Sequence, residues 1–190
     1  DGGLSFYTRA FDFGVAKNAK LVFRRWPEGP LVVDLLQVIR SFRPHVIIAA
    51  YTDSVSDGNG QHEAIGTLVE SAFEAAHDST HYSAAACGPR WTPRKLYRYG
   101  NGITIDATEY DALLGKTYAE IGLESRAQHR SQGLLGLTTP KRRGELLVRL
   151  ARVDAKPESD VGPIAEHSIF DGIDTSFSRF TDSAQTPAAV

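Results

Sequence analysis

This sequence has neither a pair of cysteines nor a segment that could span a membrane. It contains a single cysteine, Cys87, which excludes an internal disulfide bond and any paired-cysteine motif for zinc or redox chemistry. No apolar run approaches the length of a membrane span, and no signal peptide is visible. We therefore expect a chain that does not span a membrane.

Methionine is absent as well, and the chain opens on Asp1-Gly2-Gly3 without a start-like segment. Its last residues, SAQTPAAV, are typical of a tail or a cut end. Both ends favour a piece of a longer protein, and a signal peptide further upstream would leave the compartment undecided.

An excess of charge of one sign is also lacking. The chain has 21 Lys and Arg against 23 Asp and Glu, a net charge of -2. This balance gives no electrostatic case for binding nucleic acid or an anionic membrane surface. Neither a phosphate-binding loop nor a GxGxxG motif occurs. What is present, 190 residues with 42% hydrophobic content, suffices for one domain with a core.

The stretch from Arg43 to Ala76 is the most informative part of the chain. Residues 46–51 form a short apolar, β-branched run that predicts a buried strand. Residues 53–60 are rich in Asp, Ser, Asn and Gly and predict a polar loop. From Gln61 onward, apolar residues recur at helical spacing. Because ligands bind outside the carboxyl ends of strands in open α/β sheets, we expect the functional site in this loop and at this helix start.

The other segments complete the pattern. Residues 31–42 carry one apolar stripe, with Pro30 in a first-turn position, and predict a helix that ends at Arg43-Pro44. Helix, strand and helix in succession predict an α/β fold with a mostly parallel sheet flanked by helices. Further expectations are a short helix within 17–26, a turn at 27–30, a long loop at 77–93, short strands at 95–99 and 103–107 around an Asn-Gly turn, a helix within 112–132, a strand or helix at 145–153 and a linker at 154–162.

Two residues of the central stretch have the chemistry of a metal site. His62 could bind zinc through a neutral ring nitrogen, whereas a surface or capping histidine is the commoner case. Asp57 could orient a histidine or simply stabilise the Asp-Gly turn, which is the commoner role. Asp53 is the other donor in the loop. A zinc site needs three protein ligands, so this spacing alone does not build one.

The remaining candidates have ordinary explanations. Glu63 suits the positive end of the helix dipole, and His129 lies near the end of its predicted helix, where a cation is favourable. Cys87 has no base nearby in the sequence, which therefore does not support a cysteine hydrolase. No partner pattern accompanies the other histidines, which are His45, His77, His81 and His167.

Beyond these patterns, the chain resembles a known enzyme family. Residues 43–66, RPHVIIAAYTDSVSDGNGQHEAIG, are similar to the second signature of the PIG-L/LmbE-like deacetylases, where a strand and loop lead to D-G-H-x-x-H at a helix start. WTPRKLYRY (91–99) resembles a strand entry of bacterial members, and ESRAQHRSQG (124–133) a late helix of the family. FYTRAFDFG and SIFDGIDTSFSRF resemble a large bacterial subgroup of exported proteins with further domains, so the similarity spans most of residues 4–180.

The resemblance implies a Rossmann-like layered fold and zinc-dependent removal of an N-acetyl group from an N-acetylglucosamine-type substrate. Residues 1–153 would form the C-terminal part of the deacetylase domain, and residues 154–190 a linker and the start of a following segment. An exported or periplasmic location would follow from the subgroup. In the family, a His and an Asp of an upstream H-P-D-D motif bind the zinc together with the last His of D-G-H-x-x-H, and the other Asp acts as general base. H-P-D-D does not occur in this chain, so the missing N-terminal segment of the same protein is the expected partner.

Carried over residue by residue, His62 matches the third zinc ligand and Asp57 the aspartate of the motif. Asn59 stands where the family has the histidine that stabilises the transition state. An asparagine can donate a hydrogen bond to an oxyanion, but it cannot act as an acid. Tyr51 and His129 are the candidate substrate-binding residues beside this site.

These departures leave a second hypothesis open. The chain could be a degenerate deacetylase fold that binds a carbohydrate or a partner domain without turning it over. Aromatic side chains would line such a surface, although packing in the core is their commoner role. The candidates are Tyr51, Trp91, Tyr97 and Tyr99.

Overall fold

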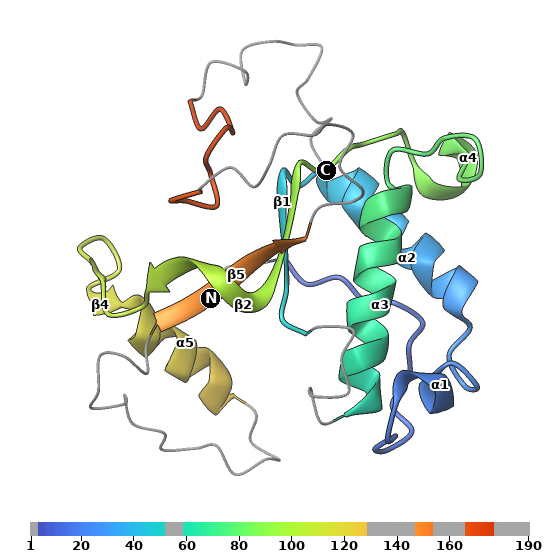
Figure 1. Ribbon diagram of the computed structural model, residues 1–190, viewed down its shortest axis with the longest axis horizontal. Coiled ribbons are helices and arrows are strands. Elements are labelled where there is room, and N and C mark those ends of the chain that lie inside the picture. Colours follow the sequence, from blue (N-terminus) through green and yellow to red (C-terminus); the bar gives the residue numbers. More distant parts are fainter. Residues whose placement is uncertain (1–3, 52–58, 129–146, 154–165, 177–190) are drawn as a thin grey trace.

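The computed structural model shows a mixed helix and strand fold and describes residues 4–51, 59–128, 147–153 and 166–176 (Figure 1). Helices and strands alternate over the first hundred residues, as expected for an α/β chain. The elements are α1 (Ala19–Val22), α2 (Glu28–Phe42), β1 (Val46–Ala49), α3 (Gly60–Ala75), α4 (Ala84–Cys87), β2 (Lys95–Asp106), β3 (Tyr110–Asp111), β4 (Lys116–Thr117), α5 (Tyr118–Ala127) and β5 (Leu147–Val153).

The main sheet has the strand order β1-β2-β5. β1 pairs with β2 in parallel, from Val46 opposite Lys95 to Ala49 opposite Arg98. β2 pairs with β5 antiparallel, and β3 and β4 form a separate antiparallel pair. The expected α/β character and the parallel pairing of β1 are therefore confirmed. The described sheet is mixed, however, and not mostly parallel.

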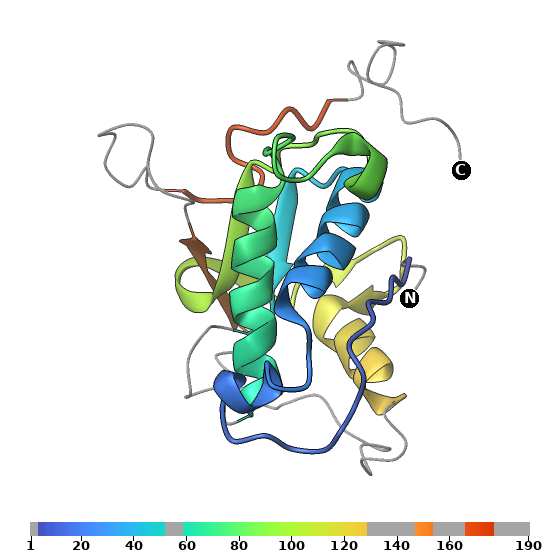
Figure 2. The same cartoon turned by 90° about the vertical axis from the view of Figure 1, so that its right-hand side faces the viewer.

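The helices α2 and α3 lie side by side on one side of β1 and β2 (Figure 2). Their facing sides, together with α1, form the largest group of buried apolar residues, which includes Val22, Trp26, Leu31, Leu36, Ala64, Leu68 and Ala72. At roughly 25 cal/mol per Å² of apolar surface, burial of such side chains is the main term that stabilises the helical layer. The buried thiol of Cys87 belongs to this core, which agrees with the absence of a nucleophile pattern around it.

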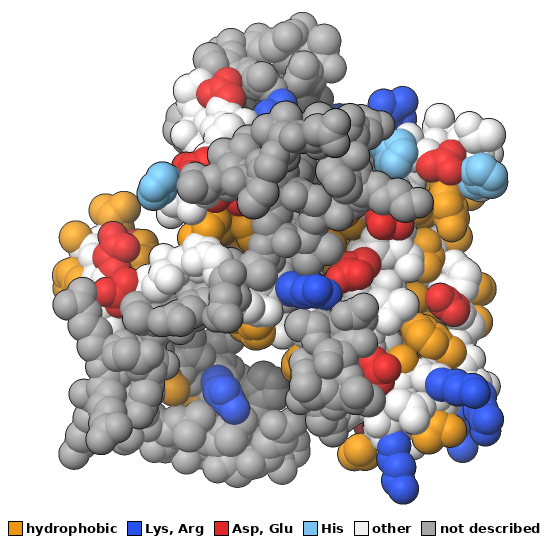
Figure 3. Space-filling view, in the orientation of Figure 1, with side chains coloured by type: hydrophobic (Ala, Val, Ile, Leu, Met, Phe, Trp, Pro, Cys, Tyr) orange, Lys and Arg blue, Asp and Glu red, His pale blue; other side chains and the backbone are white. Residues whose placement is uncertain are grey.

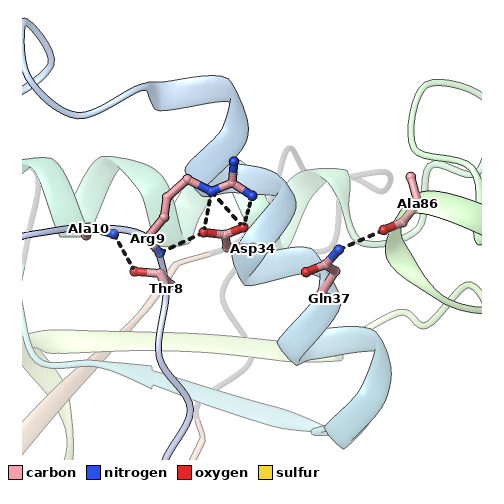
Figure 4. Close-up of polar contacts among 6 residues, drawn as sticks. All are labelled: Thr8, Arg9, Ala10, Asp34, Gln37 and Ala86. Carbon is pink, nitrogen blue, oxygen red and sulfur yellow. Dashed lines mark hydrogen bonds and ion pairs between the residues drawn. The ribbon is translucent and has the colours of Figure 1, made fainter.

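α2 is also held by polar contacts on both of its flanks (Figure 4). Arg9 in the N-terminal segment donates two hydrogen bonds from Nε and one from Nη2 to the carboxylate of Asp34, the closest at 2.6 Å. The hydrogen bonds from Arg9 hold the pKa of Asp34 below its usual value. On the other flank, Gln37 donates a hydrogen bond of 2.9 Å to the carbonyl of Ala86. These contacts join the N-terminal segment and α4 to α2.

The start of α2 differs from the expected turn at residues 27–30. The helix already begins at Glu28, so Pro30 lies in its first turn. The first four N–H groups of a helix have no partner within the helix, and a proline that lacks an N–H is therefore tolerated there. The end is as expected: Arg43 adopts a left-handed conformation with φ 56° directly before Pro44, and its N–H donates to Ile39.

The strands predicted at 95–99 and 103–107 are confirmed as strand, but the separation of the two by a turn is wrong. Residues 95–106 form one strand, β2, and its pairing with β5 shifts register between Tyr99 and Ile103. Gly100-Asn101-Gly102 therefore form a bulge. The same backbone freedom that suits a hairpin turn also suits a bulge, and β5 pairs with both halves of β2. The region 145–153, for which strand and helix were both open, forms the strand β5.

Residues 166–176 contact the first half of β2. The Nζ atom of Lys95 lies 2.9 Å from a carboxylate oxygen of Glu166, and both side chains are less than a tenth exposed. The hydroxyl of Tyr97 donates a hydrogen bond of 2.8 Å to the same carboxylate, and Ile169 packs against Tyr97. A buried charged pair of this kind requires both partners, because either one alone would be an uncompensated buried charge. The expected domain boundary at residue 153 stays a prediction.

Candidate functional site

The structure brings Tyr51 and His62 together at the predicted position. Tyr51 lies two residues beyond the end of β1, and His62 is the third residue of α3. Their rings are stacked, with centroids 3.8 Å apart and planes inclined by 11°. Both side chains are half-buried. Tyr51, just beyond β1, and His62, in the first turn of α3, therefore form one aromatic pair near the carboxyl end of a parallel strand.

This stacking leaves the ring nitrogens of His62 on the edge of the pair. A histidine binds a metal through a nitrogen lone pair that lies in the ring plane, whereas Tyr51 covers a face of the ring. Within the part of the chain that the structure describes, no hydrogen bond uses either ring nitrogen; the backbone N–H of His62 donates to Asn59. The orientation of His62 is thus compatible with one ligand of a zinc site.

The described residues do not complete such a site. Over 4–51, 59–128, 147–153 and 166–176, no three His, Cys, Asp or Glu side chains come together as metal ligands. The other two predicted members, Asp57 and His129, lie outside the described residues. The zinc assignment, and the roles of Asp57 and His129 in catalysis and substrate binding, stay predictions.

Asn59 is the N-cap of α3. Its backbone is extended, with φ -149° and ψ 128°, and its side-chain oxygen accepts a hydrogen bond of 2.9 Å from the N–H of Gln61. Asparagine is among the preferred N-cap residues because this contact satisfies one of the unpaired N–H groups of the first turn. Asn59 therefore has a structural role that the sequence analysis did not assign to it.

Side chains in the first turn of α3 form hydrogen bonds with the backbone of residues 14–19, which lead into α1. Gln61 accepts a hydrogen bond from the N–H of Ala16 and donates one to the carbonyl of Gly14. The carboxylate of Glu63 accepts a hydrogen bond of 2.9 Å from the N–H of Ala19. Glu63 thus has a specific partner in addition to its favourable place in the helix dipole. The sequence could not have revealed these contacts, since the partners are more than 40 residues apart.

Gly60, between Asn59 and Gln61, is the point of closest approach. Its N–H donates a hydrogen bond of 2.7 Å to Ala16. A Cβ atom at this position would lie 2.5 Å from the carbonyl oxygen of Asn18. Only a glycine fits here. Together with Gln61 and Glu63, it fixes the position from which His62 projects.

Two apolar hollows lie along α2 and α3, away from the predicted site residues. The larger, about 270 Å³, is lined by side chains of α2, β1 and α3. The second, about 210 Å³, is lined by side chains of α2 and α3 and by Thr8, Ala10 and Trp26. Tyr51, Asn59 and His62 line neither hollow.

Another histidine, His81 on the loop after α3, differs from His62 in having a carboxylate partner. The Nδ1 atom of His81 lies 2.6 Å from Oδ2 of Asp78. The same carboxylate accepts hydrogen bonds from the N–H groups of Thr80 and His81. Contacts with His81, and then the Thr80 N–H, lower the pKa of Asp78 from 3.8 to about 2. The pair is exposed and closes a turn, so it serves the loop structure.

Comparison with known proteins adds no assignment to this geometry. No model of a protein family matches the chain, and no curated protein matches it. Within the described residues, no helix has the length and apolar character needed to cross a bilayer.

Proposed function

We propose that this chain forms the C-terminal part of the catalytic domain of a zinc-dependent N-deacetylase of the PIG-L/LmbE-like kind. Its substrate would be an N-acetyl sugar or a related N-acetyl compound. The observation that supports this best is the position of His62, whose ring is stacked on Tyr51 at the start of α3 and beside the carboxyl end of β1. Ligands of open α/β sheets bind at this edge.

The same proposal extends the observed α/β layer to a Rossmann-like fold. The order α2, β1, α3, α4, β2, with β1 and β2 parallel, contains the strand–helix–strand unit from which such a fold is built. β1 is an edge strand of the described sheet. In the intact protein, the upstream segment with the H-P-D-D motif would add to this layer.

Each residue of the site has a separate task in this proposal. His62 would hold zinc through a ring nitrogen, with the other ligands from the upstream segment; zinc, when bound, polarises the acetamide carbonyl and supplies an activated water. Tyr51 fixes the orientation of the His62 ring by stacking on it. Asp57 would position a neighbouring polar group, and His129 would contact the sugar. The side-chain amide N–H of Asn59 would donate to the oxyanion, while its oxygen caps α3.

The role of Asn59 as a helix cap favours one alternative, a non-catalytic module with the same fold. A residue kept to cap α3 need not take part in chemistry. In that case the Tyr51–His62 pair would be part of a surface that binds a carbohydrate or a partner domain without turnover.

Restoring a histidine at position 59 separates the two functions. If the protein is an enzyme with a retuned oxyanion donor, Asn59→His, made in the protein with its upstream segment included, should raise zinc-dependent acetate release from N-acetylglucosamine by about 100-fold. Because the substitution also removes the cap, the free energy of unfolding should fall by about 1 kcal/mol. Asn59→Asp keeps the cap and removes the donor, so it should lose activity without losing stability.

The binding module predicts a different pattern. Neither wild-type protein nor Asn59→His would release acetate, yet both would bind N-acetylglucosamine in a calorimetric titration. That outcome would refute the enzymatic proposal.

A further inference from the structure

The surface around α1 carries an unusual concentration of positive charge. Four cations and no Asp or Glu fall within residues 13–27, so the net charge of -2 leaves -6 for the rest of the chain. α1 buries Ala19 and Val22 and turns its other residues outward. The four cationic side chains, Lys17, Lys20, Arg24 and Arg25, are all exposed.

Two acidic groups near α1 accept hydrogen bonds from backbone N–H groups and not from these cations. The closest acid of α3, Glu63, accepts the backbone N–H of Ala19, and the carboxylate of Asp12 accepts the N–H of Gly14. None of the ion pairs formed by the described residues includes Lys17, Lys20 or either arginine. The guanidinium of Arg25 lies 5.3 Å from the centre of the Phe13 ring, which holds the charge on the surface.

Exposed apolar side chains lie among these cations. Val15 is 83% exposed and Leu21 is 37% exposed, and both belong to the same short segment. Figure 3 shows Lys and Arg side chains gathered over α1 at the lower right of the molecule, with hydrophobic side chains between them. We call this set the α1 surface: Val15, Lys17, Lys20, Leu21, Arg24 and Arg25.

We propose that the α1 surface docks peripherally on an anionic phospholipid bilayer. A bilayer with anionic headgroups attracts clustered Lys and Arg side chains, and its interface accepts exposed apolar side chains between them. The α1 surface offers both features within one segment. This inference is independent of the proposed deacetylase activity.

The apolar members of the set favour a bilayer over nucleic acid. Single-stranded nucleic acids bind by stacking bases on flat aromatic rings, which Val15 and Leu21 lack. The aromatic residues of this segment are committed elsewhere: Phe13 lies under Arg25, and the buried indole of Trp26 donates its N–H to the carbonyl of Phe11.

The charge distribution would also orient the protein on the membrane. The remainder of the chain is acidic and is repelled by the same headgroups. Because this repulsion and attraction both fall off within about a Debye length, roughly 8 Å in physiological salt, only the end that carries α1 should approach closely.

Vesicle sedimentation tests the proposal on the full 190-residue chain. Vesicles of phosphatidylcholine alone are compared with vesicles that contain one third phosphatidylglycerol, at low and at physiological salt. We expect binding to the anionic vesicles only, weakening as salt is raised. Each cation near the surface contributes about fivefold to the partition coefficient, so Lys20→Gln/Arg24→Gln should lower it about 30-fold. Val15→Ser should weaken binding without changing its salt dependence.

A matched control neutralises two exposed cations outside the α1 surface, Arg90→Gln/Arg126→Gln, and should bind like wild type. Thermal unfolding confirms that each variant is folded. The proposal is overturned if wild-type protein ignores anionic vesicles, if it binds both vesicle types equally, or if the two double variants behave alike. Tighter binding to a single-stranded DNA oligonucleotide than to the anionic vesicles would also overturn it, in favour of a nucleic-acid surface.

Discussion

At the scale of single residues, the buried guanidinium of Arg40 organises the helical layer. Its side chain is 1% exposed and donates hydrogen bonds to four backbone carbonyls, those of Ala76, Asp78, Tyr82 and Gly88. These carbonyls belong to the end of α3, to the loop that follows it and to the end of α4. A planar group with five donors can hold several carbonyls at once, and a positive charge is favourable at a helix C-terminus.

Arg40→Ala should therefore lower the free energy of unfolding by at least about 3 kcal/mol, because buried carbonyls lose a charged donor and a cavity remains. Arg40→Lys should recover only part of this loss. Urea denaturation measures both. Gln37→Ala, which removes one exposed hydrogen bond from the same helix, should lower the free energy of unfolding by about 1 kcal/mol or less. Equal losses for Arg40→Ala and Gln37→Ala would contradict this role for Arg40.

Two glycines on helices should respond in opposite ways to the same substitution. Gly60→Ala places a Cβ atom 2.5 Å from the backbone of Asn18, so we expect a loss of about 1–3 kcal/mol in the free energy of unfolding. Gly122 lies inside α5, where a Cβ atom would have no described atom within 4 Å. Gly122→Ala should be neutral or stabilise by up to about 1 kcal/mol, since alanine favours the helix. Urea denaturation of the pair gives the comparison, and stabilisation by Gly60→Ala would show that α1 and α3 do not meet closely.

At the scale of elements, helices were predictable from the sequence and strands were less so. The apolar stripes of residues 31–42 and 61–76 predicted α2 and α3 because helical periodicity is local information. β2 was divided wrongly, since whether Gly100-Asn101-Gly102 forms a turn or a bulge depends on β5, about 50 residues later. The functional edge expected after β1 stays a prediction. The stacking of Tyr51 on His62 and the hydrogen bond from Ala16 to Gln61 could not be predicted, because they depend on tertiary contacts.

The loop between α3 and α4 should contribute to the pH dependence of stability. The folded pKa of Asp78, about 2, lies below its ordinary value of 3.8, so the unfolded chain binds a proton first as the pH falls. The stabilisation from this carboxylate is therefore complete above pH 3.8 and is lost as the pH falls toward about 2.

Asp78→Asn should remove this contribution, and stability should then fall less steeply with decreasing pH over that interval. Urea denaturation at several acidic pH values measures the slopes. Asp12→Asn is the control, because that carboxylate accepts a single backbone hydrogen bond, from Gly14. If wild type and Asp78→Asn lose stability in parallel, the turn contacts of Asp78 do not stabilise the folded state.

At the scale of the whole molecule, the net charge does not reveal the cluster of cations around α1 on which the proposed membrane binding depends. A value of -2 argued against an anionic membrane partner, yet residues 13–27 around α1 contain four exposed cations and no Asp or Glu. Net charge sums over the chain, whereas a docked surface responds only to charges within about a Debye length. The cluster of cations can be read from the sequence, but its exposure and its lack of ion pairs among the described residues come from the structure.

The catalytic proposal depends on a small site at the start of α3 and not on an extended charged surface. Its sequence support comes from D-G-N-G-Q-H at residues 57–62, and its structural support from the place and orientation of His62. Everything else in the proposal follows from His62 being a zinc ligand.

Zinc content after equilibrium dialysis against excess Zn²⁺, measured by elemental analysis, tests that claim most directly. The comparison needs the protein with its upstream H-P-D-D segment included, its His62→Ala variant, and its His81→Ala variant as a control for the pair with Asp78. We predict zinc bound by wild type and by His81→Ala, and lost in His62→Ala. No zinc in wild type, or equal zinc in wild type and His62→Ala, would contradict the account.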